Sequence, residues 1–276
     1  MKDSKDAKKP GKDVAAAKGS EKDAKDSKPK DAKPEKPLPG TMTPVARAGD
    51  EVRREAGPWT PTVQRLLTHL RDNGVTWCPE PRGYTSDGRE TLSYLKGKVP
   101  TYPLPDYVYD EAVLTTAAQW MRQLHDLTAD FDDGNQRWRA HRRKPVEAIC
   151  HNDFAPYNMV FKNGELVGLI DWDFAAPGPR LWDLSYLAYR LGPLMRPTNP
   201  AVPNLSLDIF HRVQLLLDAY GSDVSVPELL AAVVDRLEDL GEFTSAVAAK
   251  KKDEALASDA RNYAQDAEYL RSLLPS

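Results

Sequence analysis

The stretch from Ala148 to Leu191 constrains the fold most, because two short apolar runs in it are bounded by polar residues. These runs, Met159 to Phe161 and Leu166 to Ile170, are separated by the pair Asn163-Gly164. An Asn-Gly pair between two apolar runs is typical of a β-hairpin. The start of the first strand and the end of the second are neighbours in an antiparallel pair. The hairpin would therefore bring the polar residues on its two sides to one place.

The polar residues around this predicted hairpin have the chemistry of a cation site. His151, Asp153 and Asn158 precede the hairpin, and Asp171 follows it. Mg²⁺ prefers oxygen ligands, takes one or two protein carboxylates and keeps substrate phosphates for its remaining positions. Phosphoryl transfer requires such a metal to neutralise the phosphates and an aspartate to orient the attacking hydroxyl. The sequence therefore predicts that Asp153, Asn158 and Asp171 converge on one site.

The pattern H-x-D-x-x-x-x-N, then a hairpin, then I-D-W-D resembles the aminoglycoside phosphotransferase and choline-kinase branch of the protein-kinase-like superfamily. By this resemblance, Asp153 matches the catalytic aspartate and His151 the histidine that supports the catalytic loop. Asn158 and Asp171 match the Mg²⁺ ligands. Each residue taken singly would more often be a turn, cap or structural residue. The assignment therefore depends on the order and spacing of the whole pattern.

Two further aspartates follow the predicted hairpin. Asp173 is open to two interpretations, a second acid near the site or a cap for the segment that follows. Asp183, in the sequence L-W-D-L, looks like the acid at the start of a helix in the family. We interpret it as a structural residue that ties this helix to the metal loop.

By the same resemblance, residues 38–99 form a reduced N-terminal lobe. A small hairpin is predicted there, with its second strand at Glu51 to Arg54. The family's glycine-rich loop, strand lysine and helix glutamate have no match in this segment. Arg53 or Arg54 is then the nearby cation for nucleotide phosphates, and Arg53 is preferred. The alternative is two solvated arginines on an edge strand.

Two more strands are expected at residues 81–84 and 90–95, joined by an Asp-Gly turn. By resemblance, Ser93, Tyr94 and Leu95 at the end of the second strand form the hinge between the lobes, and their backbone holds the adenine edge. The alternative for these three residues is a plain strand that leads into a loop.

The remaining residues, 100–276, are predicted to form a mainly helical lobe. Acids in its C-terminal helical part could attract a cationic acceptor such as an aminoglycoside or choline, although solvated helix faces carry such acids as well. These acids are Asp208, Asp218, Asp235, Glu238, Asp239 and Glu242. Including the helix of the first lobe, which begins with Thr60 as N-cap, the predicted helices lie at about residues 60–72, 110–127, 183–191, 206–220, 227–240 or beyond, and 257–274.

Residues 1–37 have a different composition, mainly Lys, Asp, Ala, Ser and Pro. Such a segment buries too little apolar surface to offset its ordering entropy, so we expect it to be disordered. Its interspersed aspartates and lack of aromatics make nucleic-acid binding unlikely. The chain shows no run long enough to span a bilayer and no secretory signal, and its two cysteines, Cys78 and Cys150, are no disulfide framework. A cytoplasmic enzyme without a membrane partner is expected.

These observations predict an α+β, protein-kinase-like fold with a reduced β-rich N-terminal lobe and a mainly helical C-terminal lobe. The predicted reaction moves the γ-phosphoryl group of ATP or GTP, bound with Mg²⁺, to a hydroxyl of a small molecule. One alternative is a non-catalytic relative that binds nucleotide or ligand, which the missing N-lobe groups favour. Another is a scaffold with an interaction tail. The presence of Asp153, Asn158 and Asp171 together favours catalysis, and the acceptor, the nucleotide and the oligomeric state stay open.

Overall fold

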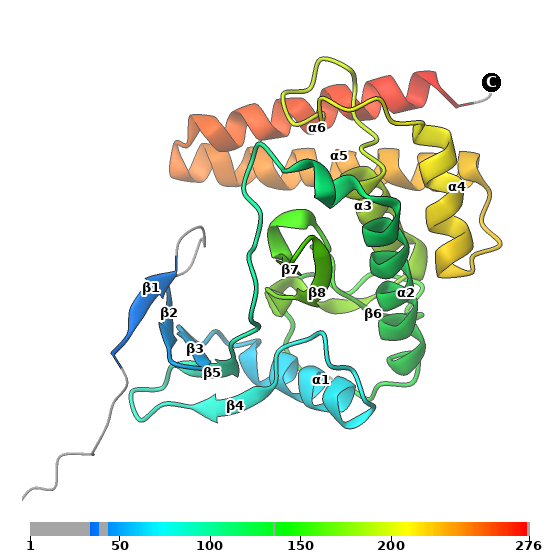
Figure 1. Cartoon of the computed structure of the whole chain (residues 1–276). Helices are drawn as coiled ribbons and strands as arrows, with labels where there is room; N and C mark the ends of the chain where they lie inside the picture. Colours follow the sequence, from blue (N-terminus) through cyan, green and yellow to red (C-terminus); the bar gives the residue numbers. More distant parts are fainter. Residues whose placement is uncertain (1–33, 39–43, 135, 275–276) are drawn as a thin grey trace, which may run out of the picture. The chain divides into compact units, whose positions relative to one another are not determined.

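The computed structural model describes residues 34–38, 44–134 and 136–274, and the described residues from Glu35 onward form one compact unit. A small antiparallel sheet with one helix is followed by a mainly helical part (Figure 1). The predicted α+β class is confirmed. The predicted disorder of residues 1–37 lies, as far as residue 33, outside the described residues. Strand β1 begins at Lys36, inside the end of that segment.

The N-terminal sheet has five strands in the order β1-β2-β3-β5-β4. Both predicted hairpins of this lobe are present, β2 with β3 and β4 with β5. The register of β3 against β5 places Arg54 opposite Glu90. The strands are β1 Lys36–Leu38, β2 Val45–Ala48, β3 Glu51–Arg54, β4 Pro81–Tyr84 and β5 Glu90–Ser93.

The six predicted helices are all present. Thr60 is the first residue of α1 and not its N-cap, because its Oγ1 accepts from the N–H of Gly57 (2.9 Å) while Trp59 takes the cap position. No helix in the described part of the chain is both long and apolar enough to cross a membrane. The helices are α1 Thr60–Asp72, α2 Glu111–Leu127, α3 Arg180–Leu191, α4 Ile209–Tyr220, α5 Val226–Lys251 and α6 Glu254–Ser272.

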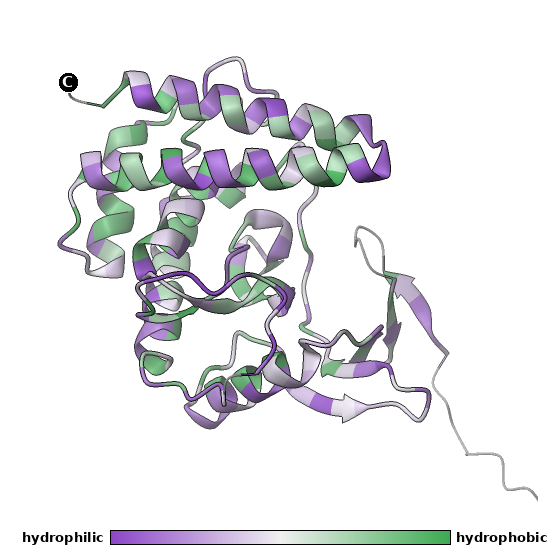
Figure 2. Ribbon diagram, turned by 180° about the vertical axis from the view of Figure 1, so that it is seen from behind, coloured by the Kyte–Doolittle hydropathy of each residue, from purple (hydrophilic) through white to green (hydrophobic). Residues whose placement is uncertain are grey.

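Helix α5 extends to Lys251, in agreement with the prediction of a helix from residue 227 to 240 or beyond. A capping box of Ser225 and Glu228 starts the helix, and α6 packs along it as an antiparallel partner (Figure 1). Both helices alternate hydrophobic and hydrophilic residues along their length (Figure 2). Such amphipathic helices are stabilised by burying their apolar stripes against a neighbour.

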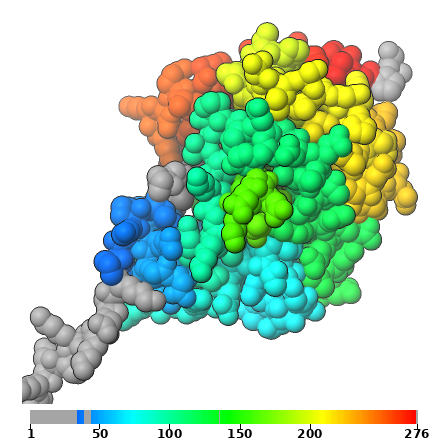
Figure 3. Space-filling view, viewed as in Figure 1, coloured from blue at the N-terminus to red at the C-terminus, as the bar shows by residue number. Residues whose placement is uncertain are grey.

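The predicted hairpin of the motif is formed by β7 (Met159–Lys162) and β8 (Glu165–Leu169). Its turn residues Asn163 and Gly164 have φ of 54° and 85°, and these positive values explain the Asn-Gly pair. The tip of the hairpin reaches the surface (Figure 3). A second strand pair, β6 (Ala148–Cys150) with β9 (Ala176–Gly178), was not predicted, and it closes the two ends of the motif on each other.

Three tryptophans hold the motif against the rest of the core. Trp77 stacks flat on Trp120 of α2, with ring centroids 4.9 Å apart, and lies 6.0 Å from Trp172. The carbonyl of Trp77 also accepts from the N–H of Leu169 at 2.8 Å. Trp172, in the middle of the I-D-W-D sequence, is fully buried. Burial of its large ring fixes the aspartates on either side of it.

The connection from β5 to the helical part lies against β7 with no spare room. Lys98 and Phe161 exchange two backbone hydrogen bonds, each of 2.8 Å. A Cβ built on the neighbouring Gly97 would lie 2.6 Å from the carbonyl oxygen of Phe161 and 2.5 Å from Cγ1 of Val160. A glycine is therefore required where the connection crosses the hairpin.

We expect Gly97→Ala to destabilise the protein by about 1–3 kcal/mol, because the backbone of β7 must shift to admit the methyl group. Gly241→Ala is the matched control, since a Cβ in that helix meets nothing closer than 3.6 Å. It should stabilise α5 by about 0.5–1 kcal/mol. Denaturant unfolding of both variants measures these effects, and equal stabilities would contradict the tight crossing.

Candidate active site

The loop after β6 and the end of the hairpin carry the three residues predicted to converge. Nδ2 of Asn158 donates to Oδ2 and to the backbone oxygen of Asp153, both at 2.9 Å. The N–H of Ile170 donates to the carbonyl of Asn158 at 2.9 Å, which sets Asp171 beside the loop. The structure therefore brings Asp153 and Asn158 into direct contact and places Asp171 next to them.

The electrostatic setting of Asp153 suits a base that works near neutral pH. Burial raises its pKa to about 6, and the negative charge of Asp171 acts in the same direction. Hydrogen bonds from Tyr157 and Asn158 and the charge of Arg190 oppose this rise. A carboxylate with such a pKa is ionised at pH 7 yet basic enough to accept a proton.

A chain of hydroxyl groups leads from Asp153 to a buried arginine. Tyr157 donates to Oδ1 of Asp153 at 2.6 Å, and its oxygen lies 2.7 Å from that of Tyr186. Because the single proton of Tyr157 goes to Asp153, Tyr186 is the donor to Tyr157. Nε and Nη2 of Arg190 in turn donate to Tyr186 at 3.1 and 3.0 Å. This chain fixes the orientation of Asp153, and sequence reasoning missed it, although Tyr157 lies inside the motif.

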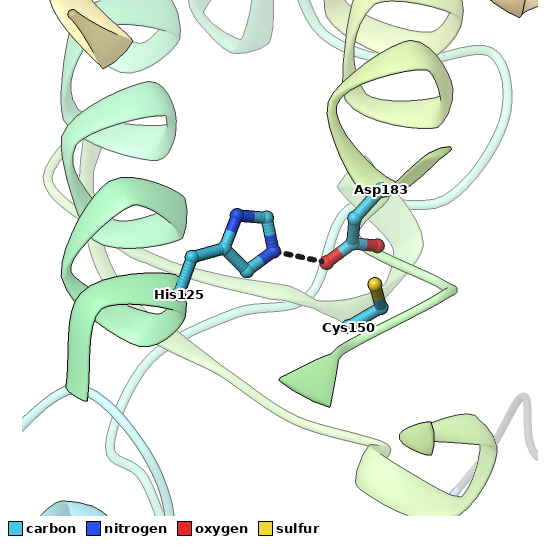
Figure 4. Close-up of side chains that lie close together, drawn as sticks. All are labelled: His125, Cys150 and Asp183. Atoms are coloured by element: carbon cyan, nitrogen blue, oxygen red, sulfur yellow. Dashed lines mark hydrogen bonds and ion pairs between the residues drawn. The ribbon is translucent and has the colours of Figure 1, made fainter. Parts of the chain in front are cut away.

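Asp183 anchors the backbone of the loop. It is fully buried, and its two oxygens accept from the N–H groups of His151 (2.7 Å) and Asn152 (2.8 Å). His125 of α2 contacts the same carboxylate at 3.2 Å (Figure 4). Although burial acts to raise the pKa of Asp183, these partners hold it below its usual value. The geometry agrees with the structural role expected for Asp183.

His125, Cys150 and Asp183 lie close enough together to resemble a metal site (Figure 4). Both oxygens of Asp183 are already bound by N–H donors. Burial raises the pKa of the Cys150 thiol well above its usual value, so the sulfur keeps its proton. A protonated thiol is a poor metal ligand. The three side chains are therefore part of the loop anchor.

His151 supports the loop from inside the core. Its ring is fully buried, lies edge-on to Trp172 at 4.7 Å, and accepts from the N–H of Asp153 through Nδ1 at 3.3 Å. Burial lowers its pKa to about 4, so the ring is neutral at pH 7. Its contacts position Asp153, in agreement with the supporting role that the resemblance implied.

Arg54 reaches the site, whereas Arg53 was the residue preferred from the sequence. Nη2 of Arg54 donates to Asp173 at 2.6 Å, and its Nη1 lies 3.6 Å from Asp171. Arg53 instead bonds Glu35 and Glu51. Neighbouring residues of a strand point to opposite faces of the sheet, so only one of the two can face the metal loop. The choice of Arg53 is corrected to Arg54.

The partner of Arg54 lies on a strand and not on the helix where the family carries its glutamate. Nε of Arg54 donates to Glu90 of β5 at 2.6 Å, and Glu90 is fully buried. Gln64 of α1 completes the group, donating to the other oxygen of Glu90 at 3.3 Å. The ion pair of the N-terminal lobe is therefore present, with its acid moved from helix to strand.

Asp173 lies next to the site and caps no helix. It is buried, and its two oxygens accept from Arg54 and, at 3.1 Å, from Arg139. The structure thus favours the first of the two interpretations of this residue. Two guanidinium groups hold its negative charge beside that of Asp171.

Two of the three predicted hinge residues already use their backbone N–H groups within the protein. The N–H of Ser93 donates to Glu80 at 2.9 Å, and that of Tyr94 donates to Asp50 at 2.8 Å. These two N–H groups are therefore not available to an adenine edge, and the assignment of the three residues as the hinge stays a prediction. Among the described residues, no hydrogen bond uses the N–H of Leu95. Leu95 alone keeps a backbone donor for such a contact.

The donor atoms around Asp171 fit a divalent cation. Burial and the nearby charge of Asp173 both raise the pKa of Asp171, and Asp171 in turn raises that of Asp153. A cation between these groups would relieve their mutual repulsion. Asp171, which has a positive φ of 60°, offers carboxylate oxygens. Asn158 offers its amide oxygen, because its contacts with Asp153 use only Nδ2. This oxygen-only donor set fits Mg²⁺.

Comparison with known proteins identifies the family of the chain. Residues 103–199 match the model of the phosphotransferase enzyme family. The trifolitoxin immunity protein of Rhizobium leguminosarum bv. trifolii is 35% identical over 191 residues, which are 66% of this chain and 72% of that protein. The chain belongs to the phosphotransferase enzyme family.

Solved structures share the fold at low sequence identity. One is a choline/ethanolamine kinase family protein from Mesorhizobium loti, with 16% identity, a TM-score of 0.57 and 88% of each chain covered. Another is the GDP and kanamycin complex of APH(2")-IIia, with 12% identity, a TM-score of 0.59, and 87% of this chain and 94% of that chain covered. These likenesses establish the kinase-like fold.

We expect the Asp153 carboxyl of the metal-free protein to titrate near pH 6. Tyr157 stabilises the ionised form, so Tyr157→Phe should raise this pKa by roughly one unit. The ¹³C chemical shift of the Asp153 carboxyl measures it directly. Tyr84→Phe, at an exposed tyrosine of β4, should leave the titration unchanged. An unaltered pKa in Tyr157→Phe would show that the hydroxyl chain does not act on Asp153.

Proposed function

We propose that this protein transfers the γ-phosphoryl group of a nucleoside triphosphate to a hydroxyl group of a small molecule. The observation that carries the proposal is Asp153, whose two oxygens are each fixed by a donor beside the pair Asn158 and Asp171. The acceptor oxygen forms the new bond to phosphorus, and the bond from phosphorus to the bridging oxygen breaks. The nucleoside diphosphate leaves with the electron pair, and Asp153 takes the hydroxyl proton.

The nucleotide side of the site is assigned from the same contacts. Asn158 and Asp171 would hold Mg²⁺, which supplies positive charge to the phosphates. Arg54 would meet the phosphates, with Glu90 fixing its position. Leu95 would offer its backbone to the base. The nucleotide complex among the structures of similar fold supports a nucleotide at this place, and ATP and GTP are both candidates.

We also propose the division into lobes on this basis, with residues 38–99 and the preceding strand as the nucleotide-covering lobe and residues 100–276 as the catalytic lobe. The name of the relative from Rhizobium suggests a biological role, protection against a toxin. With the proposed activity, such protection would come from phosphorylation of a hydroxyl of the toxin. Protection by binding alone is the second candidate, because an immunity protein can act by sequestering its toxin. Turnover separates the two candidates.

The first test is a thermal shift of the full chain with ATP or GTP, with and without Mg²⁺. At a nucleotide concentration 100 times Kd, binding should stabilise the protein by about 2.7 kcal/mol, and only with Mg²⁺. Asp171→Asn should remove the response, because it removes a charged metal ligand. Asp153→Asn should keep nucleotide binding and lower phosphoryl transfer to hydroxyl compounds at least about 100-fold. Transfer at the wild-type rate in Asp153→Asn would refute the assignment.

The second test compares the two arginines of β3. Arg54→Lys keeps the charge beside Glu90 but loses the planar group that bonds Glu90 and Asp173 at once. We expect its nucleotide Kd to rise about tenfold, a change of about 1.4 kcal/mol. Arg53→Lys, whose partners are Glu35 and Glu51, should bind nucleotide as the wild type does. The opposite order of effects would restore Arg53 as the phosphate contact.

A further inference from the structure

Arg190 of α3 is a buried cation enclosed by aromatic rings. The residue is 9% exposed, and its guanidinium carbon lies 5.1–5.8 Å from four tyrosine ring centroids, those of Tyr157, Tyr186, Tyr189 and Tyr263. The electron-rich faces of these rings attract the cation and restrict its movement. The position of the guanidinium is therefore set before any ligand arrives.

Arg190 has no ionic partner among the described residues. Its contacts are all phenol oxygens: two bonds to Tyr186, one of 3.0 Å to Tyr263, and one of 3.5 Å from Nη1 to Tyr102. No described carboxylate lies within 4.0 Å of it. Asp153 is linked to it only through two hydroxyl groups. Asp153 and Asp259 act on the charge of Arg190 only from beyond ion-pair distance. A buried charge without a directly bound counter-ion is costly unless a ligand supplies one.

The other buried arginines of the chain differ from Arg190 in their partners. Arg212 donates to the carbonyl oxygens of Leu191 and Tyr109. Arg236 donates to the carbonyl of Asn152 and lies 3.7 Å from a carboxylate of Asp239. These arginines bind groups with formal or strong partial negative charge. Arg190 has only neutral hydroxyls, and its Nη1 makes only the long contact with Tyr102.

Arg190 lines a pocket that reaches the tyrosine bound to the proposed catalytic aspartate. The pocket has a volume of about 460 Å³ and is also lined by Tyr157, which donates to Asp153. Tyr102, Tyr263 and Asn199 form other parts of its wall. Asp259 is the one acid among its described lining residues, and its side chain is exposed to solvent. A ligand in this pocket meets a buried positive charge and aromatic surface.

Two acids of the C-terminal helices, Glu238 and Asp239, are paired with arginines outside this pocket. Glu238 pairs with Arg271, and Asp239 pairs with Arg143 and Arg236. Neither lines the pocket. The buried charge among the described lining residues is therefore that of Arg190, and Asp259 is an acid at the exposed part of the lining. A buried positive charge disfavours a cationic acceptor such as an aminoglycoside or choline.

We propose that this pocket is the acceptor site and that Arg190 binds an oxyanion of the acceptor, a carboxylate, sulfate or phosphate. The acceptor is then a hydroxyl compound with a negatively charged group. The aromatic wall packs the carbon skeleton between the two groups, while the hydroxyl lies at Asp153. This inference rests on the proposed phosphotransferase function, because the same aspartate must receive the hydroxyl.

Binding of small anions tests the site without knowledge of the acceptor. Acetate, succinate and sulfate are titrated into the full chain by calorimetry, against sodium chloride of equal ionic strength. We expect saturable binding of at least one of these anions, weakened at least tenfold in Arg190→Gln. Arg271→Gln, at an exposed arginine of α6, serves as the matched control and should bind as the wild type does. Equal binding by wild type and Arg190→Gln, or no binding of any anion, would overturn the proposal.

A second pair of variants keeps the test decisive if Arg190→Gln fails to fold. Tyr102 is 44% exposed, and its hydroxyl lies next to Nη1 of Arg190. Tyr102→Glu places a carboxylate there, whereas Tyr102→Gln places a neutral group of the same size. We expect anion binding at least tenfold weaker in Tyr102→Glu than in Tyr102→Gln. Equal binding by the two variants would overturn the proposal.

Turnover then separates this inference from the proposed function. With Mg²⁺ and nucleotide, N-acetylserine is compared with choline and with N-acetylserinamide, which carries a neutral carboxamide in place of the carboxylate. The proposal is supported if the KM for N-acetylserine is lower than the KM for the amide and if Arg190→Lys raises the KM for N-acetylserine. Transfer to choline or the amide with equal or better kcat/KM would overturn it while the phosphotransferase function stands. Anion binding that depends on Arg190, in a protein without Mg²⁺-dependent nucleotide binding, would support the anion site and overturn the phosphotransferase function.

Discussion

The hydrogen bonds that Asp183 accepts from the backbone of His151 and Asn152 are the interaction on which the rest of the site depends. A carboxylate buried this deeply would cost several kcal/mol without such partners. With them, it fixes the loop to the start of α3. Arg236 of α5 holds the same loop from the other side, through the carbonyl of Asn152. Two helices of the C-terminal lobe thus set where Asp153 points.

Two arginines then distribute charge around the aspartates of the site. Arg54 joins the N-terminal sheet to the metal loop through Asp173, with Glu90 buried behind it. Arg190 acts from α3 through Tyr186 and Tyr157. Burial is the main cause of the raised pKa values of Asp153 and Asp171, and repulsion from a neighbouring aspartate adds to the rise in each. A cation bound between the aspartates would neutralise the negative charge that the two arginines offset only in part.

The sequence predicted the parts of the site that depend on local geometry. The hairpin of β7 and β8 follows from an Asn-Gly turn, and it carries Asn158 and Asp171 to its open end within a few residues. The sequence did not predict which arginine faces the site, because that depends on which face of the strand is covered. Arg53 and Arg54 differ by one position, and a shift of one residue moves a side chain to the opposite face. Only the packing of the sheet against α1 and the metal loop decides between them.

By itself, the sequence determined the fold class, the helices, the hairpins and the three residues of the proposed metal and catalytic site, because short-range periodicity and turn chemistry encode them. The tertiary structure decided which groups surround these residues. Glu90 meets Arg54 from 36 residues away, and Tyr263 meets Arg190 from 73 residues away. No local pattern marks such pairs, since their proximity arises only when separate elements pack into one core. The pocket beside Asp153, and its positive charge, belong to this second kind of information.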